Sequence, residues 1–162
     1  MKNQLTHFDQ KGEAHMIDVS KKRTTSRTAI AKCKVSMMGS TLHLIEMGKS
    51  KKGDVIGIAR LAGIMAAKKT SDLIPLCHPL QICNVSLQFL PDFKSNFIEI
   101  KATVKTLGKT GVEMEALTAV SVSALTIYDM LKSVDKNMTI IETRLMFKDG
   151  GDSGQYVNSE EL

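Results

Sequence analysis

The chain has 162 residues, of which 43% are hydrophobic and 24% charged, values typical of a single globular domain with a real core. Its three cysteines lack CxxC spacing, and the sequence shows neither a 20-residue apolar run nor an N-terminal apolar h-region. These features argue against a disulfide framework, a zinc site, a membrane span and a secretory signal, so we expect one cytoplasmic domain over residues 1–162.

Residues 1–28 are polar and have no helical or strand period, which predicts a mobile N-terminal arm. A basic cluster in this arm comprises Lys21, Lys22, Arg23 and Arg27. A solvated surface accounts for any one of these side chains, and the alternative is an arm that closes over a phosphate. Arg27 is the best candidate for the second role, because it adjoins the first ordered element and a planar guanidinium suits phosphate.

The next stretch alternates apolar and polar residues over 29–38 and therefore predicts a strand. A short helix is expected over 42–47. A longer helix over 55–69 is capped by Asp54. Small residues in the longer helix would let another backbone approach closely: Gly57, Ala59, Gly63 and Ala67.

Lys52 lies just before the N-terminus of this longer helix. A surface lysine is the simpler interpretation. Because helix N-termini attract anions, the alternative is a proton donor or a phosphate clamp.

Residues 72–80 form an apolar loop that is interrupted by Pro75 and Pro79. Pro79 holds His78 in an extended conformation, beside Cys77. A lone histidine is more often structural than a ligand, and no second Cys/His cluster completes a metal set. We favour substrate contact over metal binding for this loop.

Alternating residues over 83–90 and 96–107 predict a β-hairpin, and 137–147 predicts a last strand, followed by a mobile tail over 149–162. A long helix separates the hairpin from the last strand. The order βαββαβ, with an extra helix in the first crossover, predicts an α+β, ferredoxin-like fold. In that fold helices pack on one face of an antiparallel sheet.

The long helix, within residues 108–132, has charged residues at both ends and none from Ala116 to Tyr128. One apolar stripe can pack on the sheet. The opposite side is also uncharged and should be covered too. We therefore expect an oligomer with this helix at or near an interface.

Asp129 and Lys132 are three residues apart, so they lie on one side of this helix. A surface ion pair is one interpretation, and a shared proton-transfer site is the other. Glu113 lies roughly 24 Å from Asp129 along the helix axis, at 1.5 Å per residue. One nucleotide-sized ligand would hardly reach both ends, so a functional site using both would be shared between subunits.

Two long motifs, LIPLCHPL (73–80) and GKTGVEMEALTAVSVSALTIYDMLK (108–132), closely resemble the cyclic pyranopterin monophosphate synthase family of molybdenum cofactor biosynthesis. LTHFDQKGEAHMIDVS (5–20) and KGDVIGIARLAGIMAAKKTSDLIP (52–75) also look like this family. The resemblance covers about the whole chain.

The resemblance implies a ferredoxin-like homohexamer, built as a trimer of dimers with active sites at the dimer interface. It implies a lyase that converts (8S)-3′,8-cyclo-7,8-dihydroguanosine 5′-triphosphate into cyclic pyranopterin monophosphate and diphosphate. From the sequence itself we expect no resident cofactor or metal, and it leaves open whether Mg²⁺ accompanies the substrate triphosphate, since no cluster with carboxylate metal-ligand spacing stands out.

Carried over by motif, Asp129 corresponds to the active-site aspartate of the family, and Lys52 and Lys132 to its catalytic lysines. Further positions correspond to its substrate-binding segments or are associated with its pocket: Leu76, Cys77, His78, Glu113, Met114, Glu115 and Arg27. The tail departs from many relatives, because Asp152 stands where a base is usual, which puts any phosphate contact there in doubt.

Two other functions remain open from the sequence. A ferredoxin-like nucleic-acid-binding module would use the net charge of +5, but it would need exposed aromatic residues, and aromatics are only 4% of the chain. An inactive scaffold in cofactor assembly would tolerate loss of Lys132.

Overall fold

The computed structural model describes residues 7–9, 11–48 and 53–159. The chain forms, in order, β1 (Thr25–Ser36), α1 (Gly39–Glu46), α2 (Val55–Lys68), α3 (Thr70–Leu73), β2 (Ile82–Asp92), β3 (Phe97–Gly108), α4 (Glu113–Leu131), β4 (Thr139–Asp149) and β5 (Tyr156–Val157).

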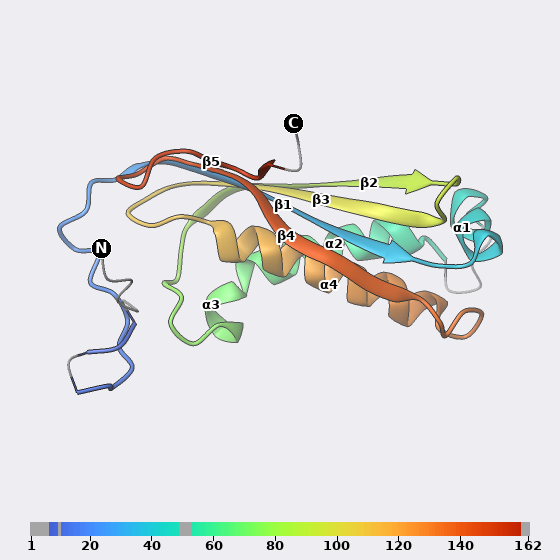
Figure 1. Ribbon diagram of the computed structural model, residues 1–162, viewed down its shortest axis with the longest axis horizontal. Helices are drawn as coiled ribbons and strands as arrows, with labels where there is room; N and C mark the ends of the chain where they lie inside the picture. Colours follow the sequence, from blue (N-terminus) through green and yellow to red (C-terminus); the bar gives the residue numbers. More distant parts are fainter. Residues whose placement is uncertain (1–6, 10, 49–52, 160–162) are drawn as a thin grey trace.

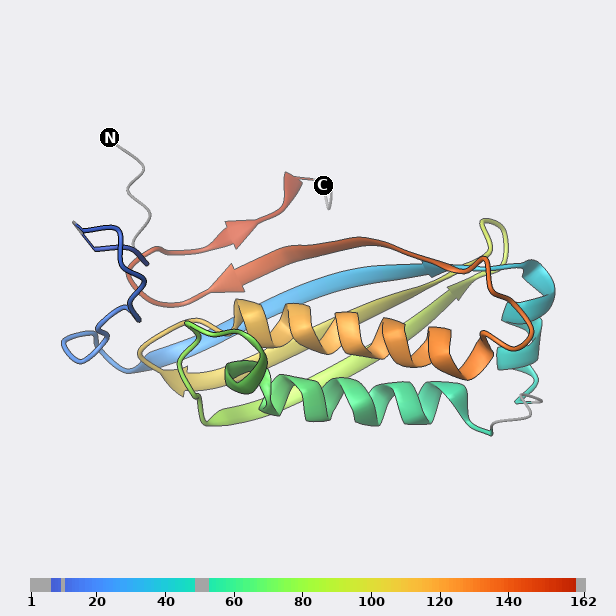
Figure 2. The same ribbon diagram turned by 90° about the horizontal axis from the view of Figure 1, so that it is seen from below.

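The strands form one antiparallel sheet in the order β2-β3-β1-β4-β5. The long helices α2 and α4 lie side by side on one face of this sheet, and within the described residues no helix lies on the other face (Figures 1 and 2). The predicted α+β, ferredoxin-like arrangement is confirmed. The predicted strands and long helices are all present.

Period-two burial explains how the sheet supports the helix layer. In β1 every second residue from Arg27 to Val35 is buried, and its neighbours are half-buried on the other face. β3 repeats this pattern from Ile98 to Val104. The buried faces of both strands pack against α4, so α4 is the centre of the core.

The contact between α2 and α4 depends on small residues. A Cβ atom at Gly63 would lie 2.3 Å from Ser123 Oγ and 3.0 Å from the backbone oxygen of Ala119. Ser123 Oγ donates a hydrogen bond to the backbone oxygen of Ala59 at 2.9 Å. The predicted close approach at Ala59 and Gly63 is therefore confirmed. The helices run antiparallel, so α2 begins at the end of the molecule where α4 finishes (Figure 2).

The covering of α4 differs from the expectation. On the side that faces away from the predicted sheet-packing stripe, Thr118 is buried, Val122 and Thr126 are half-buried, and Leu125 is 59% exposed. α2 of the same chain, which the expectation did not consider, packs against α4 where Ala59 and Gly63 meet Ser123 and Ala119. Within one subunit Leu125 stays exposed and Val122 and Thr126 are only half-buried, so the expected oligomer with α4 at or near an interface stays a prediction.

By length and composition, α4 is the described helix that would be long and apolar enough to cross a membrane. Inside the protein 56% of its most apolar window is buried. This is the character of a core helix packed between a sheet and a second helix.

Three boundaries differ from the sequence prediction. β1 begins at Thr25 rather than at residue 29, so Arg27 belongs to the sheet and not to the arm. The short helix α3 directly follows α2. Part of the expected mobile tail forms β5, which pairs with β4 through Phe147 and Val157.

Candidate functional site

A pocket of about 190 Å³ opens at the N-terminal end of α4. Its walls come from the loop that follows α3, the loop between β3 and α4, the first turn of α4 and the N-terminal arm. Six of the residues predicted to bind substrate line it: Leu76, Cys77, His78, Glu113, Met114 and Glu115. The structure thus joins two motifs that are about 35 residues apart in the sequence.

The arm contributes the opposite wall of the pocket through His7, Ile17, Val19 and Lys22. His78 ties the arm to the loop, because its Nε2 lies 2.8 Å from the backbone oxygen of Ile17. A carbonyl oxygen only accepts, so Nε2 carries a proton, and Nδ1 of a neutral ring is left as an acceptor. The single histidine of this motif therefore has a structural contact and also lines the pocket.

Glu115 is the buried acid of the pocket, with 4% of the residue exposed. Burial, together with the neighbouring charge of Glu113, raises its pKa from 4.5 to about 7. A carboxyl group with this pKa can donate or accept a proton near neutral pH.

Burial makes the Cys77 thiol less reactive, whereas it prepares Glu115 for proton exchange. Burial raises the pKa of its thiol above 9.0, and the nearby Glu115 carboxylate raises it as well. The thiolate is the nucleophilic form of cysteine, so these surroundings disfavour covalent catalysis at Cys77. Contact with a ligand is the role that fits this side chain.

Lysine side chains lie near the mouth of the pocket. Lys148, from β4, is 3.9 Å from the carboxylate of Glu113 and donates to Ser153 Oγ at 2.6 Å. Lys109 donates to the backbone oxygen of Ser20 at 2.6 Å. Neither Lys109 nor Lys148 was a predicted site residue. For Lys148, nothing in the sequence places the end of β4 beside this loop.

Arg27 does not line the pocket and is only 7% exposed. Its Nε, Nη1 and Nη2 donate to the backbone oxygens of Gly108, Gly150 and Lys109 at 3.4, 3.2 and 3.3 Å. The guanidinium therefore joins the loop before α4 to the start of the tail. Arg27 thus supports the loop before α4, which forms part of the pocket wall, without lining the pocket itself.

Asp129 and Lys132 lie at the far end of α4. Lys132 Nζ is 2.7 Å from Asp129 Oδ1, and the side chains are 52% and 62% exposed. The hydrogen bond and charge of Asp129 raise the pKa of Lys132, which keeps it an ammonium group. Because α4 runs unbroken from Glu113 to Leu131, Glu113 and Asp129 stay roughly 24 Å apart along its axis.

Lys52, the other predicted catalytic lysine, lies outside the described residues. The helix that follows it, α2, begins at the same end of the molecule as Asp129 and Lys132 (Figure 2). Among the described predicted site residues, six therefore line the pocket, Arg27 bonds to the loop before α4, and Asp129 and Lys132 lie at the opposite end of α4. Over residues 7–9, 11–48 and 53–159, no three His, Cys, Asp or Glu side chains gather as a metal site would require.

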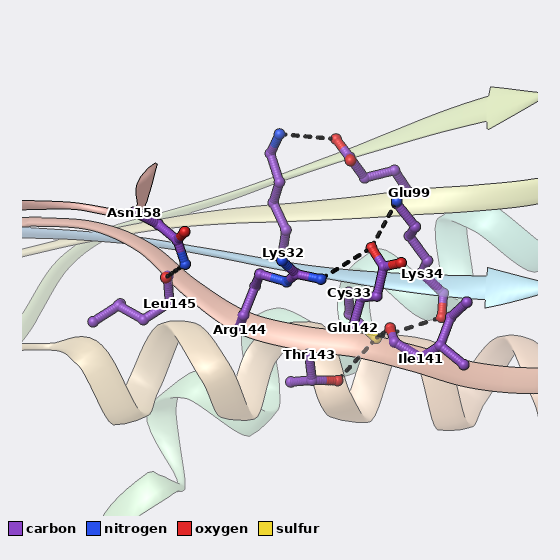
Figure 3. Close-up of polar contacts among 10 residues, drawn as sticks. All are labelled: Lys32, Cys33, Lys34, Glu99, Ile141, Glu142, Thr143, Arg144, Leu145 and Asn158. Carbon is purple, nitrogen blue, oxygen red and sulfur yellow. Dashed lines mark hydrogen bonds and ion pairs between the residues drawn. The ribbon is translucent and has the colours of Figure 1, made fainter. Parts of the chain in front are cut away.

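The open face of the sheet carries ion pairs (Figure 3). Glu142 lies 2.7 Å from Lys34 and 3.3 Å from Arg144, and Lys32 lies 3.3 Å from Glu99. Lys32, Lys34 and Arg144 on this face thus each have a carboxylate partner. This arrangement disfavours the nucleic-acid-binding alternative, which requires a positive surface with exposed aromatic rings.

Comparison with known proteins gives consistent results. The MoaC family model matches residues 16–151. The chain is 63% identical over 152 residues to the cyclic pyranopterin monophosphate synthase of Dinoroseobacter shibae, covering 94% of this chain and 96% of that protein. The same-named protein of Jannaschia sp. is 59% identical over 94% of this chain and 93% of its own length. That of Heliobacterium modesticaldum is 58% identical over 96% and 98%.

Proposed function

This chain belongs to the MoaC family, and we propose that it acts as a cyclic pyranopterin monophosphate synthase in molybdenum cofactor biosynthesis. The family resemblance of its motifs is confirmed. The proposed reaction converts (8S)-3′,8-cyclo-7,8-dihydroguanosine 5′-triphosphate into cyclic pyranopterin monophosphate and diphosphate, as a phosphorus–oxygen lyase. The observation that carries this proposal is the pocket at the start of α4, which gathers six expected substrate-binding residues.

The chemistry of the pocket supports this substrate class. Glu115 offers a carboxyl group that exchanges a proton near neutral pH, which suits a ring bearing N–H and C=O groups. Leu76 and Met114 provide apolar contact for the flat ring. Lys22 lines the same pocket, and lysines at its mouth suit a triphosphate.

The final step of the proposed reaction forms a cyclic phosphate. A sugar hydroxyl oxygen bonds to the α-phosphorus, the bond from that phosphorus to the bridging oxygen breaks, and pyrophosphate leaves. A base must take the hydroxyl proton, and cations must neutralise charge on the leaving group. The Lys132 ammonium, held by Asp129, fits the second task.

Asp129 and Lys132 can reach the pocket only if it belongs to another subunit. We therefore place the active sites between subunits of a homohexamer, a trimer of dimers, in which one α4 gives its first turn and the partner its last. The length of the unbroken helix supports this arrangement. In this proposal the enzyme is cytoplasmic and has no resident cofactor, and any Mg²⁺ arrives with the substrate triphosphate.

The direct test is incubation of the purified protein with the cyclised dihydro-GTP, following pyrophosphate and the pterin product. We expect turnover by the wild type and a loss of at least about 100-fold in Lys132→Ala, as for removal of a group that stabilises charge developing in the transition state. Lys136→Ala, an exposed lysine just beyond α4, is the matched control and should keep wild-type turnover. Salt-dependent RNA binding without turnover would instead support the nucleic-acid module.

A further inference from the structure

His7 brings an unsatisfied polar atom to the pocket. Among the described residues, two buried side-chain polar atoms have no hydrogen-bond partner, His7 Nδ1 and Thr25 Oγ1. Of these two residues, His7 lines the pocket at the start of α4. The imidazole as a whole is half-buried, but its Nδ1 is shielded from solvent.

The arm around His7 is a small folded unit. The backbone N–H of His15 donates to the oxygen of His7 at 3.0 Å, and Phe8 pairs with Ala14 in an isolated antiparallel bridge. The carboxylate of Asp9 accepts two backbone N–H groups of the turn, at 2.8 and 2.9 Å. These short-range bonds hold the backbone of His7 in place without using its side chain.

The arm is also fastened to the rest of the pocket wall. Ile17 accepts the hydrogen bond from His78 at 2.8 Å, and Ser20 accepts from Lys109 at 2.6 Å. Both anchors connect the arm to loops that flank the first turn of α4. His7 therefore belongs to a wall that is joined to the site at two points.

An unsatisfied buried polar atom destabilises a protein, and such atoms are uncommon unless a ligand or catalysis uses them. We propose that His7 is a substrate-binding residue: its ring turns toward the pocket when substrate enters, and Nδ1 then forms a hydrogen bond with a polar group of the cyclised guanine nucleotide. The inference rests on the proposed function and adds to it a residue of the arm. A ring of this substrate presents N–H donors and a carbonyl acceptor, and a neutral imidazole can pair with either kind.

The test uses two effects of removing Nδ1 that differ in sign: the ligand-free protein should not lose stability, but substrate binding should weaken. His7→Leu removes Nδ1 and keeps an apolar side chain, so the ligand-free protein should melt at the same temperature as the wild type or higher. Its kcat/KM for pyrophosphate release should fall about tenfold, the size of one lost hydrogen bond to substrate. His7→Asn keeps a polar atom near the Nδ1 position and should recover most of that loss.

His15→Leu is the matched control, because His15 lies on the same hairpin with its side chain exposed outside the pocket. It should leave kcat/KM unchanged. The inference is overturned if His7→Leu keeps wild-type kcat/KM. It is also overturned if the variant lowers the ligand-free melting temperature and His7→Asn restores nothing, because both results indicate a structural histidine.

A binding measurement separates this inference from the proposed function. Calorimetry with the same substrate in the Lys132→Ala background compares affinity with and without His7→Leu. If the wild type binds the compound without turning it over, the proposed function fails, and a tenfold weaker binding in the double variant still supports the role of His7. If Lys132→Ala binds the substrate with the same affinity with and without His7→Leu, the proposed role of His7 is contradicted, whatever the turnover.

Discussion

At the scale of single residues, the pocket is defined by the protonation states of its side chains. Burial favours the neutral forms of both Glu115 and Cys77, by the same desolvation. His78 uses one ring nitrogen to hold the arm. The pocket therefore combines a carboxyl group ready for proton exchange with a thiol that stays protonated.

The pKa of Glu115 predicts how stability depends on pH. The folded-state pKa of Glu115, about 7, lies above the unfolded value of 4.5. The stability that neutral Glu115 contributes is therefore fully present below pH 4.5 and is lost as pH rises through 7. At pH 8 the free energy of unfolding of Glu115→Gln should therefore exceed that of the wild type by up to about 3 kcal/mol. The variant should accordingly unfold at a higher denaturant concentration. The two proteins should converge near pH 4.5.

Urea unfolding from pH 4.5 to 8 measures this effect, with Glu13→Gln, an exposed glutamate of the arm, as the control. A parallel pH dependence in wild type and Glu115→Gln would show that another group is responsible.

At the scale of elements, the site depends on how closely α2 approaches α4. Ser123 donates to the backbone oxygen of Ala59, and Gly63 leaves room for the backbone of Ala119. The loop that carries His78 follows α2 and α3 directly. The spacing of the two helices thus sets where this loop meets the first turn of α4.

Gly63→Ala should destabilise the protein although alanine is the better helix former. Helix propensity alone favours alanine by about 1 kcal/mol, but the added Cβ would meet Ser123 Oγ at 2.3 Å, Leu87 Cδ2 at 2.9 Å and the Ala119 oxygen at 3.0 Å. We expect a net loss of about 1–3 kcal/mol, the usual cost of overpacking, measured by chemical denaturation.

The matched control is Gly63→Ala combined with Ser123→Ala, which removes the closest of these contacts. Its stability should be compared with that of Ser123→Ala alone, and the cost of Gly63→Ala should be smaller in this background. An unchanged or increased stability of Gly63→Ala would mean that the helices separate easily.

At the scale of the whole molecule, the two groups of predicted site residues lie at opposite ends of one helix. The pocket surrounds the first turn of α4, and the ion pair of Asp129 and Lys132 lies on the last. A helix cannot shorten, so one chain cannot bring these groups together. A second subunit with the opposite orientation can.

Sharing of the active site predicts complementation between inactive variants. Glu115→Ala and Asp129→Ala should each lose most turnover, and mixing them should restore part of it, because some hybrid interfaces contain one intact site. Pyrophosphate release after subunit exchange is the measurement. Mixtures of Asp129→Ala with Lys132→Ala are the control and should stay inactive, since both changes affect the same half of the site. Lack of recovery by the first pair, with exchange confirmed, would contradict sharing.

Much of the architecture follows from local sequence patterns and could therefore be predicted from the sequence. Alternation over 29–38 and 96–107 predicts the central strands, because a strand buried on one face needs a side-chain period of two. The helical span between Glu113 and Asp129 follows from composition, and their separation from the fixed helical rise. The loop 73–80 and the first turn of α4 could be named as site segments from their motifs.

Only the tertiary structure decides which distant segments complete the pocket. β1 pairs with β3 at Thr25 and Gly108 and with β4 at Thr28 and Asp149, so one strand end gathers the loop before α4 and the tail. Arg27 bonds to both, and Lys148 thereby reaches Glu113. These contacts depend on strand register, which is a long-range property that no local period encodes.

The same reasoning explains the cover of α4. From the sequence, an uncharged helix is expected to be covered on both sides, and within one subunit the second side is covered only in part. The sequence does not state which element supplies the second cover, because packing partners are chosen by the shapes of two surfaces. The structure assigns part of this cover to α2, where the small residues Ala59 and Gly63 meet Ser123 and Ala119 at backbone distance.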